Sequence, residues 1–336
     1  MADYTIPSTP VTGDIDSYDL PQYVGELFDL QPQTTKFLSM SGGLNGIRIV
    51  ESREFTWQVE DGEASAAGDT QLENASVTAS AVPRQQVKNV VEIHQEAVEF
   101  GYTAQAVVGQ LASDSARIEG TNPVRDPMQH QINKKVMKIA RDVEKSFLSG
   151  SLVNPSDNLT ARETQGIIGA ISTHTINYTT GVGGKGSAYT SLRECLDDLL
   201  VGMFEPSNDG NVAPASEDGT FVLFAGGAIA VKISDEWSSD LALAPRDRYV
   251  GGVAVNTLVT VFGEIPVVLD RYMPSGVALL ADMSVVRSVV LPIPNRGAFF
   301  IEPLAKTAAV DKAQIYGEIG LEYGPESFHG TITAIT

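Results

Sequence analysis

Residues 126–150, DPMQHQINKKVMKIARDVEKSFLSG, carry the clearest helical pattern in the chain. Apolar side chains recur every three or four residues, which places them on one stripe of a helix and leaves the opposite face charged. Asp126 and Pro127 are typical of a helix start, and Gly150 is typical of a stop. At 1.5 Å per residue the helix is a rod of roughly 33 Å. We call it the spine helix.

The spine helix divides into two sets of residues. The stripe predicted to pack on a core consists of Met128, Ile132, Val136, Ile139, Val143 and Phe147. The charged face consists of Lys134, Lys138, Arg141 and Lys145. A solvated face needs no function, so these four cations are either plain surface or a contact for an acidic partner.

The composition limits the class of protein. A chain of 336 residues with 43% hydrophobic side chains can bury a sizeable core. No stretch approaches the roughly 18 apolar residues of a membrane span, and the first 20 residues lack the pattern of a secretory signal. A single cysteine, Cys195, excludes an internal disulfide. These features predict a soluble protein made in a reducing cytoplasm.

The net charge of −19 argues against a protein that reads nucleic-acid sequence, because such proteins gather Lys and Arg against phosphates. Two interpretations of the acidic excess stay open. It suits folding in concentrated salt, where self-repulsion is screened, and it suits solubility at a high local concentration.

Residues 53–60, REFTWQVE, alternate Phe55, Trp57 and Val59 with polar side chains, which predicts a half-buried strand. Extended character resumes at 75–82, so residues 53–85 are predicted to form an elongated two-stranded excursion. A two-stranded ribbon is marginal on its own in water. We therefore expect Phe55 and Trp57 to pack on another surface, either their own domain or a neighbouring copy of the chain.

The rest of the chain predicts an α+β fold. Residues 84–100 read as one longer strand, and residues 165–290 alternate helices with apolar strands, as in a compact α/β unit. Alternation returns after residue 298. If these late strands pair with the strand near Val91, they form a sheet under the spine helix, with the α/β unit inserted.

The sequence contains few candidates for catalytic residues. Cys195 lies on the apolar stripe of a predicted helix, which favours a buried side chain over a nucleophile paired with His174. No histidine pair has zinc-ligand spacing. The glycine-rich loop 179–187, TTGVGGKGS, lacks the P-loop spacing and reads as a flexible linker. No catalytic residue, cofactor or metal site is predicted.

Four motifs, in this order, carry a resemblance to the major capsid proteins of tailed double-stranded DNA viruses. They are TTKFLS (34–39), REFTWQVEDG (53–62), RQQVKNVVEIH (84–94) and IARDVEKSFLSG (139–150). The chain departs from that family at Lys36, where proline is usual, and at His94 and Gln95, where an aromatic residue is common.

This resemblance implies the Hong Kong ninety-seven type capsid fold. The implied parts are an N-terminal arm (1–52), an extended loop (53–85), a peripheral domain with the spine helix (86–164 and 291–336) and an axial domain (165–290). It further implies a virion protein, assembled in the host cytoplasm, which forms pentamers and hexamers and encloses double-stranded DNA without reading its sequence. Implied partners are the chain itself, a portal, and a scaffold or decoration protein, with no membrane.

The implied contact between subunits lies on the extended loop, at Phe55, Trp57, Gln58, Glu60 and Asp61. An acidic part of this loop, with Glu60, Asp61, Glu63 and Asp69, is the first candidate partner for the cations of the spine helix. One relative of the fold forms lysine–asparagine cross-links from a lysine on this loop. Residues 51–85 contain no lysine, so we expect a non-covalent shell. The alternatives are an encapsulin-like compartment and, more remotely, a cysteine hydrolase using Cys195.

Overall fold

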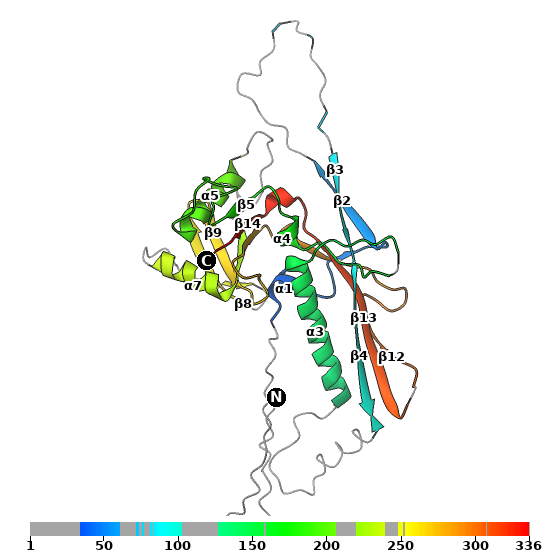
Figure 1. Ribbon diagram of the computed structural model, residues 1–336. Helices are drawn as coiled ribbons and strands as arrows, with labels where there is room; N and C mark the ends of the chain where they lie inside the picture. The colour runs from blue at the N-terminus through cyan, green and yellow to red at the C-terminus, as the bar shows by residue number, and fades with distance from the viewer. Residues whose placement is uncertain are drawn as a thin grey trace, which may run out of the picture.

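The computed structural model describes residues 34–60, 72–73, 76, 81–82, 84–102, 127–157, 159–205, 220–238, 248–250, 253–306 and 308–335. These residues form two large sheets and a two-stranded ribbon (Figure 1). No helix in this part of the chain is long and apolar enough to cross a membrane.

The first sheet is built around one long strand, β13 (Val310–Glu322). On one side β13 pairs with β4 (Glu92–Gly101). On the other side it pairs with β12 (Phe299–Pro303) and then β11 (Arg287–Val290), and β1 (Arg48–Ile49) extends β11 in parallel. Residues far apart in the chain therefore meet in one elongated sheet.

The spine helix is α3 (Pro127–Ser149), which lies along β4 and β13 (Figure 1). Asp126 lies outside the described residues. A Cβ atom at Gly150 would come within 2.5 Å of the backbone oxygens of Ser146 and Thr164. The helix therefore ends where only glycine allows the next segment to approach, and the chain continues into the short α4 (Ile167–Ala170).

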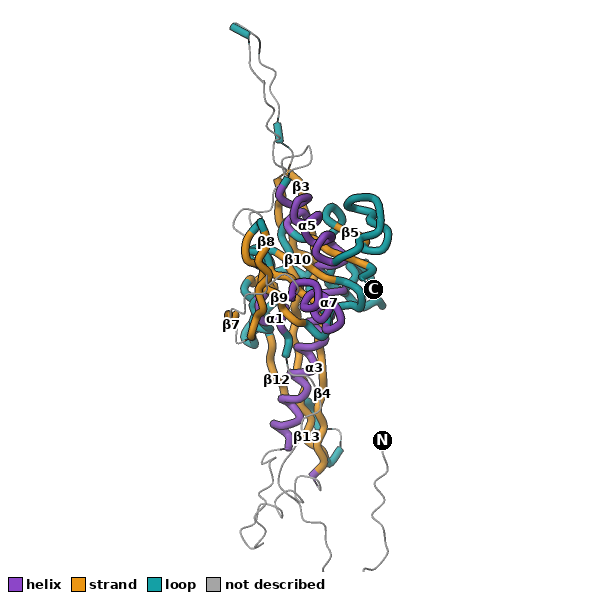
Figure 2. Tube along the Cα trace, turned by 90° about the vertical axis from the view of Figure 1, so that its left-hand side faces the viewer, coloured by secondary structure: helices purple, strands orange, loops and turns teal. Residues whose placement is uncertain are grey.

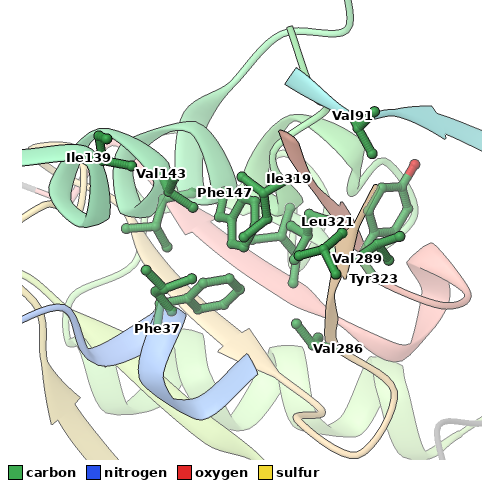
Figure 3. Packing of buried hydrophobic residues seen from close by; sticks show 14 of the residues in the cluster. Phe37, Val91, Ile139, Val143, Phe147, Val286, Val289, Ile319, Leu321 and Tyr323 are labelled. Carbon is green, nitrogen blue, oxygen red and sulfur yellow. The ribbon is translucent and has the colours of Figure 1, made fainter. Parts of the chain in front are cut away.

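The buried side chains under the spine helix form a continuous core with the short helix α1 (Lys36–Ser41) and the strands β11 and β13 (Figure 3). Ile132, Ile139, Val143 and Phe147 are buried, and Met128 and Val136 pack against the same core. The periodicity of three and four residues in the sequence thus coincides with the face that meets the sheet.

The second sheet has seven strands in the order β5-β14-β10-β6-β9-β8-β7. Their bounds are β5 (Thr175–Asn177), β14 (Gly330–Thr333), β10 (Ala278–Ala281), β6 (Val222–Ala225), β9 (Gly263–Leu269), β8 (Val253–Thr260) and β7 (Arg248–Val250). The helices α5 (Leu192–Phe204) and α7 (Gly227–Ser238) lie against each other beside it (Figure 2).

Two strands lie in a different sheet from the one expected. β14, near the C-terminus, was expected in the peripheral domain but lies between β5 and β10 of the seven-stranded sheet. β11, expected in the axial domain, pairs with β13 in the first sheet. The local alternation of a strand reports which of its faces is buried, but it carries no information about which sheet completes the pairing.

The predicted strand 84–100 is broken at Val91. β3 (Arg84–Val90) pairs with β2 (Glu54–Glu60) in the ribbon, whereas β4 pairs with β13. The strand that pairs with β2 is therefore Arg84–Val90, and most of the segment 75–82, where the return strand was expected, lies outside the described residues. A continuous extended pattern cannot reveal that the chain changes partners partway along.

Candidate assembly surface

The base of the ribbon is fixed inside its own subunit. Phe55 and Trp57 are only 8% and 9% exposed, and both belong to the core beneath the spine helix. The indole Nε1 of Trp57 donates a hydrogen bond to the Gly324 carbonyl oxygen at 2.9 Å, and its ring meets Tyr323 edge-on at 5.0 Å. This corrects the expectation that Phe55 and Trp57 contact a neighbouring subunit, since their own domain already covers them.

The outer face of the same ribbon is polar and open. Gln58 and Glu60 are exposed, and Glu60 faces Arg84 across the ribbon at 3.4 Å. Thr56 accepts a hydrogen bond from Gln86 on the same face. The predicted contact residue Asp61, like Glu63 and Asp69, lies outside the described residues. Among the predicted contact residues, Gln58 and Glu60 are those that the described ribbon presents to solvent.

The cations of the spine helix have partners within the subunit. Lys138 forms an ion pair with Glu96 of β4, and Lys135 binds the same carboxylate at 2.8 Å. These two hydrogen bonds, that of Lys135 first, lower the pKa of Glu96. Lys145 lies over the Tyr272 ring at 5.7 Å, and Lys134 and Arg141 also make interactions. An acidic loop from another subunit is therefore not needed to neutralise Lys138, which corrects the partner suggested for it.

A buried asparagine holds the point where the chain leaves the ribbon for the first sheet. The Oδ1 atom of Asn89 accepts hydrogen bonds from the backbone N–H groups of Val90 and Gln165, both at 2.8 Å. Its Nδ2 donates to the carbonyl oxygens of Leu321 at 2.7 Å and Gln165 at 3.2 Å. Asn89 thus ties together the ribbon, the segment after the spine helix and β13.

Sequence reasoning missed this role of Asn89. The available signal was an amide side chain directly before two valines, in a stretch that otherwise reads as a strand. A polar side chain that is fully buried requires hydrogen-bond partners, but the sequence does not identify them.

A second missed residue is Glu144, on the core-facing side of the spine helix. Its two carboxylate oxygens accept hydrogen bonds from the backbone N–H groups of Phe37 at 2.9 Å and Leu38 at 2.6 Å. The Phe37 ring also packs edge-on against Phe224 of the second sheet at 5.2 Å. The helix α1, which lies within the predicted arm, therefore contacts the spine helix and core residues of both sheets.

The cysteine alternative has no support from the geometry. Cys195 is 0% exposed, and burial raises the pKa of its thiol to about 12. The thiol is therefore protonated at neutral pH, whereas only the thiolate is an effective nucleophile. Among the described residues, no group of three or more His, Cys, Asp or Glu side chains is arranged to hold a metal ion.

The glycine-rich loop 179–187 is a structured turn, which corrects its interpretation as a flexible linker. Gly181 donates to the Asn177 carbonyl at 2.7 Å, and Lys185 pairs with Glu194 at 2.6 Å. A Cβ atom on Gly184 would lie 2.0 Å from the Tyr189 hydroxyl. The glycines therefore allow close packing on α5.

Comparison with solved structures places the whole described architecture in one fold. The capsid of cyanophage A-1(L) matches with a TM-score of 0.60 and 14% identity, covering 94% of this chain and 97% of that one. The capsid of a native GTA particle, computed with C5 symmetry, matches with a TM-score of 0.58 and 13% identity, covering 96% and 97%. Among curated protein sequences, none matches this chain.

The chain has the fold of the Hong Kong ninety-seven type capsid proteins. Its parts are an elongated sheet under a spine helix, a second sheet with helices beside it, and a projecting ribbon. The family model described as SU10 major capsid protein matches residues 8–336, and the chain belongs to that family. It is therefore a major capsid protein of a phage, a structural component of the virion.

The encapsulin alternative shares this fold. The SrpI encapsulin from Synechococcus elongatus matches with a TM-score of 0.53 and 12% identity, covering 97% of this chain and 96% of that one. At such identity a structural match reports the fold alone. Because the family model that spans the chain is that of a phage capsid protein, the encapsulin interpretation is the weaker one.

Proposed function

We propose that this chain assembles through pentamers and hexamers into an icosahedral shell around double-stranded DNA, in the cytoplasm of the host. Residues 53–85 reach from each subunit onto the next. The axial domain crowds the axis of each capsomer, and a portal and a scaffold or decoration protein complete the particle. The acidic chain, with its net charge of −19, repels the genome and so keeps DNA from adhering to the wall.

The observation that supports this proposal best is the division of the ribbon into an anchored base and an open outer part. Trp57 fixes the direction in which β2 and β3 leave the subunit, and Gln58 and Glu60 remain exposed beyond it. The ribbon projects away from both sheets (Figure 1). A rigidly anchored projection can meet a neighbour without first losing much conformational entropy, which favours association.

Shortening the extended loop should prevent assembly without impairing folding of the subunit. Glu60 and Arg84 are directly opposite each other in the ribbon, so residues 61–83 can be replaced by Asn-Gly, which closes a two-residue hairpin. We expect this variant to fold with thermal stability similar to that of the unassembled natural chain and to form no shells. Thermal unfolding and electron microscopy measure the two properties.

As a matched control, Asn-Gly inserted between residues 72 and 73 adds the same turn and removes nothing. It should leave shells intact. Complete shells from the shortened variant, at the yield of the natural chain, would contradict the proposed contact.

The shell should be held without covalent cross-links, because residues 51–85 contain no lysine to form an isopeptide bond with asparagine. Purified particles boiled in denaturant are expected to run on a gel as the 35.8 kDa monomer. A ladder of higher bands that survives reducing agent would refute this expectation.

A further inference from the structure

Two buried carboxyl groups meet where three parts of the subunit join. Glu144 of the spine helix is 0% exposed, and Asp270, directly after β9 of the seven-stranded sheet, is 2% exposed. Their side chains are within hydrogen-bonding reach of each other. The third part is α1, whose Phe37 and Leu38 N–H groups bind Glu144.

The hydrogen bonds at this joint leave one acceptor without a donor. The Oδ1 atom of Asp270 accepts from the Tyr272 backbone N–H at 2.8 Å, but its Oδ2 has no donor among the described groups. A buried carboxylate oxygen without a donor is costly. A proton held between Glu144 and Asp270 supplies the missing donor and removes the repulsion between two buried negative charges.

We propose that Glu144 and Asp270 share one proton, and that this proton is a pH-sensitive latch joining the arm helix α1 and the spine helix to the seven-stranded sheet. When the proton leaves for solvent, two carboxylates remain side by side in an apolar joint. One of them must then reach water, which loosens the joint between α1, α3 and β9. This inference concerns the subunit itself and does not depend on how subunits assemble.

The charged groups around the pair come from the same three parts of the subunit. From the spine helix, Arg141 and Lys145 lie near Tyr272, and Arg271 follows Asp270. Lys36 begins α1. The buried Tyr272 hydroxyl has no hydrogen-bond partner among the described residues, and burial raises its pKa, so it stays neutral. Burial, and then the charge of Asp270, raise the pKa of Glu144 to about 8, despite the two backbone N–H groups that lower it.

The direction of the pH effect follows from this raised pKa. The folded chain keeps the proton up to about pH 8, whereas the unfolded chain loses it near the ordinary value of 4.5. The contribution of the pair to stability is therefore fully present below about pH 4.5, declines as pH rises to about 8, and changes no further above it. Opening of the folded joint itself should begin near pH 8.

Replacing Asp270 with asparagine tests the latch with little change in shape. The amide oxygen still accepts from Tyr272, and the amide nitrogen donates permanently to Glu144, which keeps both bonds to α1. In the unassembled full-length chain, hydrogen exchange in 36–41 and 270–273, corrected for the intrinsic rate, should speed up at least about 10-fold between pH 7 and pH 9. In Asp270→Asn this increase should be absent.

Asp282→Asn is the matched control. Asp282 also follows a strand of the same sheet and is 1% exposed. Its Oδ1 accepts a hydrogen bond from the backbone N–H of Ser284, and its Oδ2 has no donor in the described part of the chain. Its backbone N–H donates to the Nδ1 atom of His329 at 3.2 Å, so an imidazole lies beside it where Asp270 has a second carboxyl group. This variant should keep the natural pH response in residues 36–41.

A second variant keeps the proposal testable if Asp270→Asn fails to fold. Glu144→Gln removes the titrating group at the cost of one bond to α1, and it should also abolish the response between pH 7 and pH 9. The proposal is wrong if the natural chain shows no such response, or if a folded Asp270→Asn or Glu144→Gln variant shows the full natural response.

Discussion

Replacing Trp57 with alanine is expected to lower the free energy of unfolding of the unassembled chain by about 3–5 kcal/mol. The indole is 9% exposed, packs on Tyr323 and donates to the Gly324 carbonyl. The substitution therefore leaves a cavity and a buried acceptor without its donor. Urea denaturation of the unassembled chain, followed by circular dichroism, measures the loss.

The neighbouring Gln58 provides the control for this measurement. Gln58→Ala, on the exposed face of the same strand, should change the free energy of unfolding by less than about 0.5 kcal/mol. If Trp57 instead served mainly as a contact between subunits, Trp57→Ala would leave the unassembled chain as stable as Gln58→Ala and would impair only assembly.

The second large effect is expected at Asn89. Asn89→Ala removes an amide that makes four hydrogen bonds to buried or partly buried backbone groups of Val90, Gln165 and Leu321. Each buried backbone group left without a partner costs about 1–3 kcal/mol, so we expect a total loss of about 3 kcal/mol or more. The same denaturation measurement detects it.

Gln86→Ala, on the exposed part of the same strand, loses one hydrogen bond to Thr56 and should cost about 0.5 kcal/mol or less. Equal losses in Asn89→Ala and Gln86→Ala would show that Asn89 does not hold the junction. Hydrogen exchange should in addition become faster at Gln165 in Asn89→Ala, because its N–H loses the Oδ1 acceptor.

The spine helix shows what local patterning can establish. Its apolar stripe identified the buried face, because a helix repeats every 3.6 residues regardless of its partners, and Pro127 and Gly150 indicated where it begins and ends. The order of four motifs, from 34–39 to 139–150, identified the fold of the whole chain. The contacts of the charged face could not be predicted in the same way, because Lys138 pairs with Glu96, which lies 42 residues away on β4.

The sequence by itself determined the class of the protein, the spine helix and the first strand of the ribbon. Each of these depends on the period of neighbouring side chains or on motif order. Only the tertiary structure decided that the chain changes sheets at Val91, that β14 joins the seven-stranded sheet, and that Trp57 lies inside its own subunit. It also brought Glu144 and Asp270 together. These are pairings between distant segments, and they are selected by the packing of the whole core.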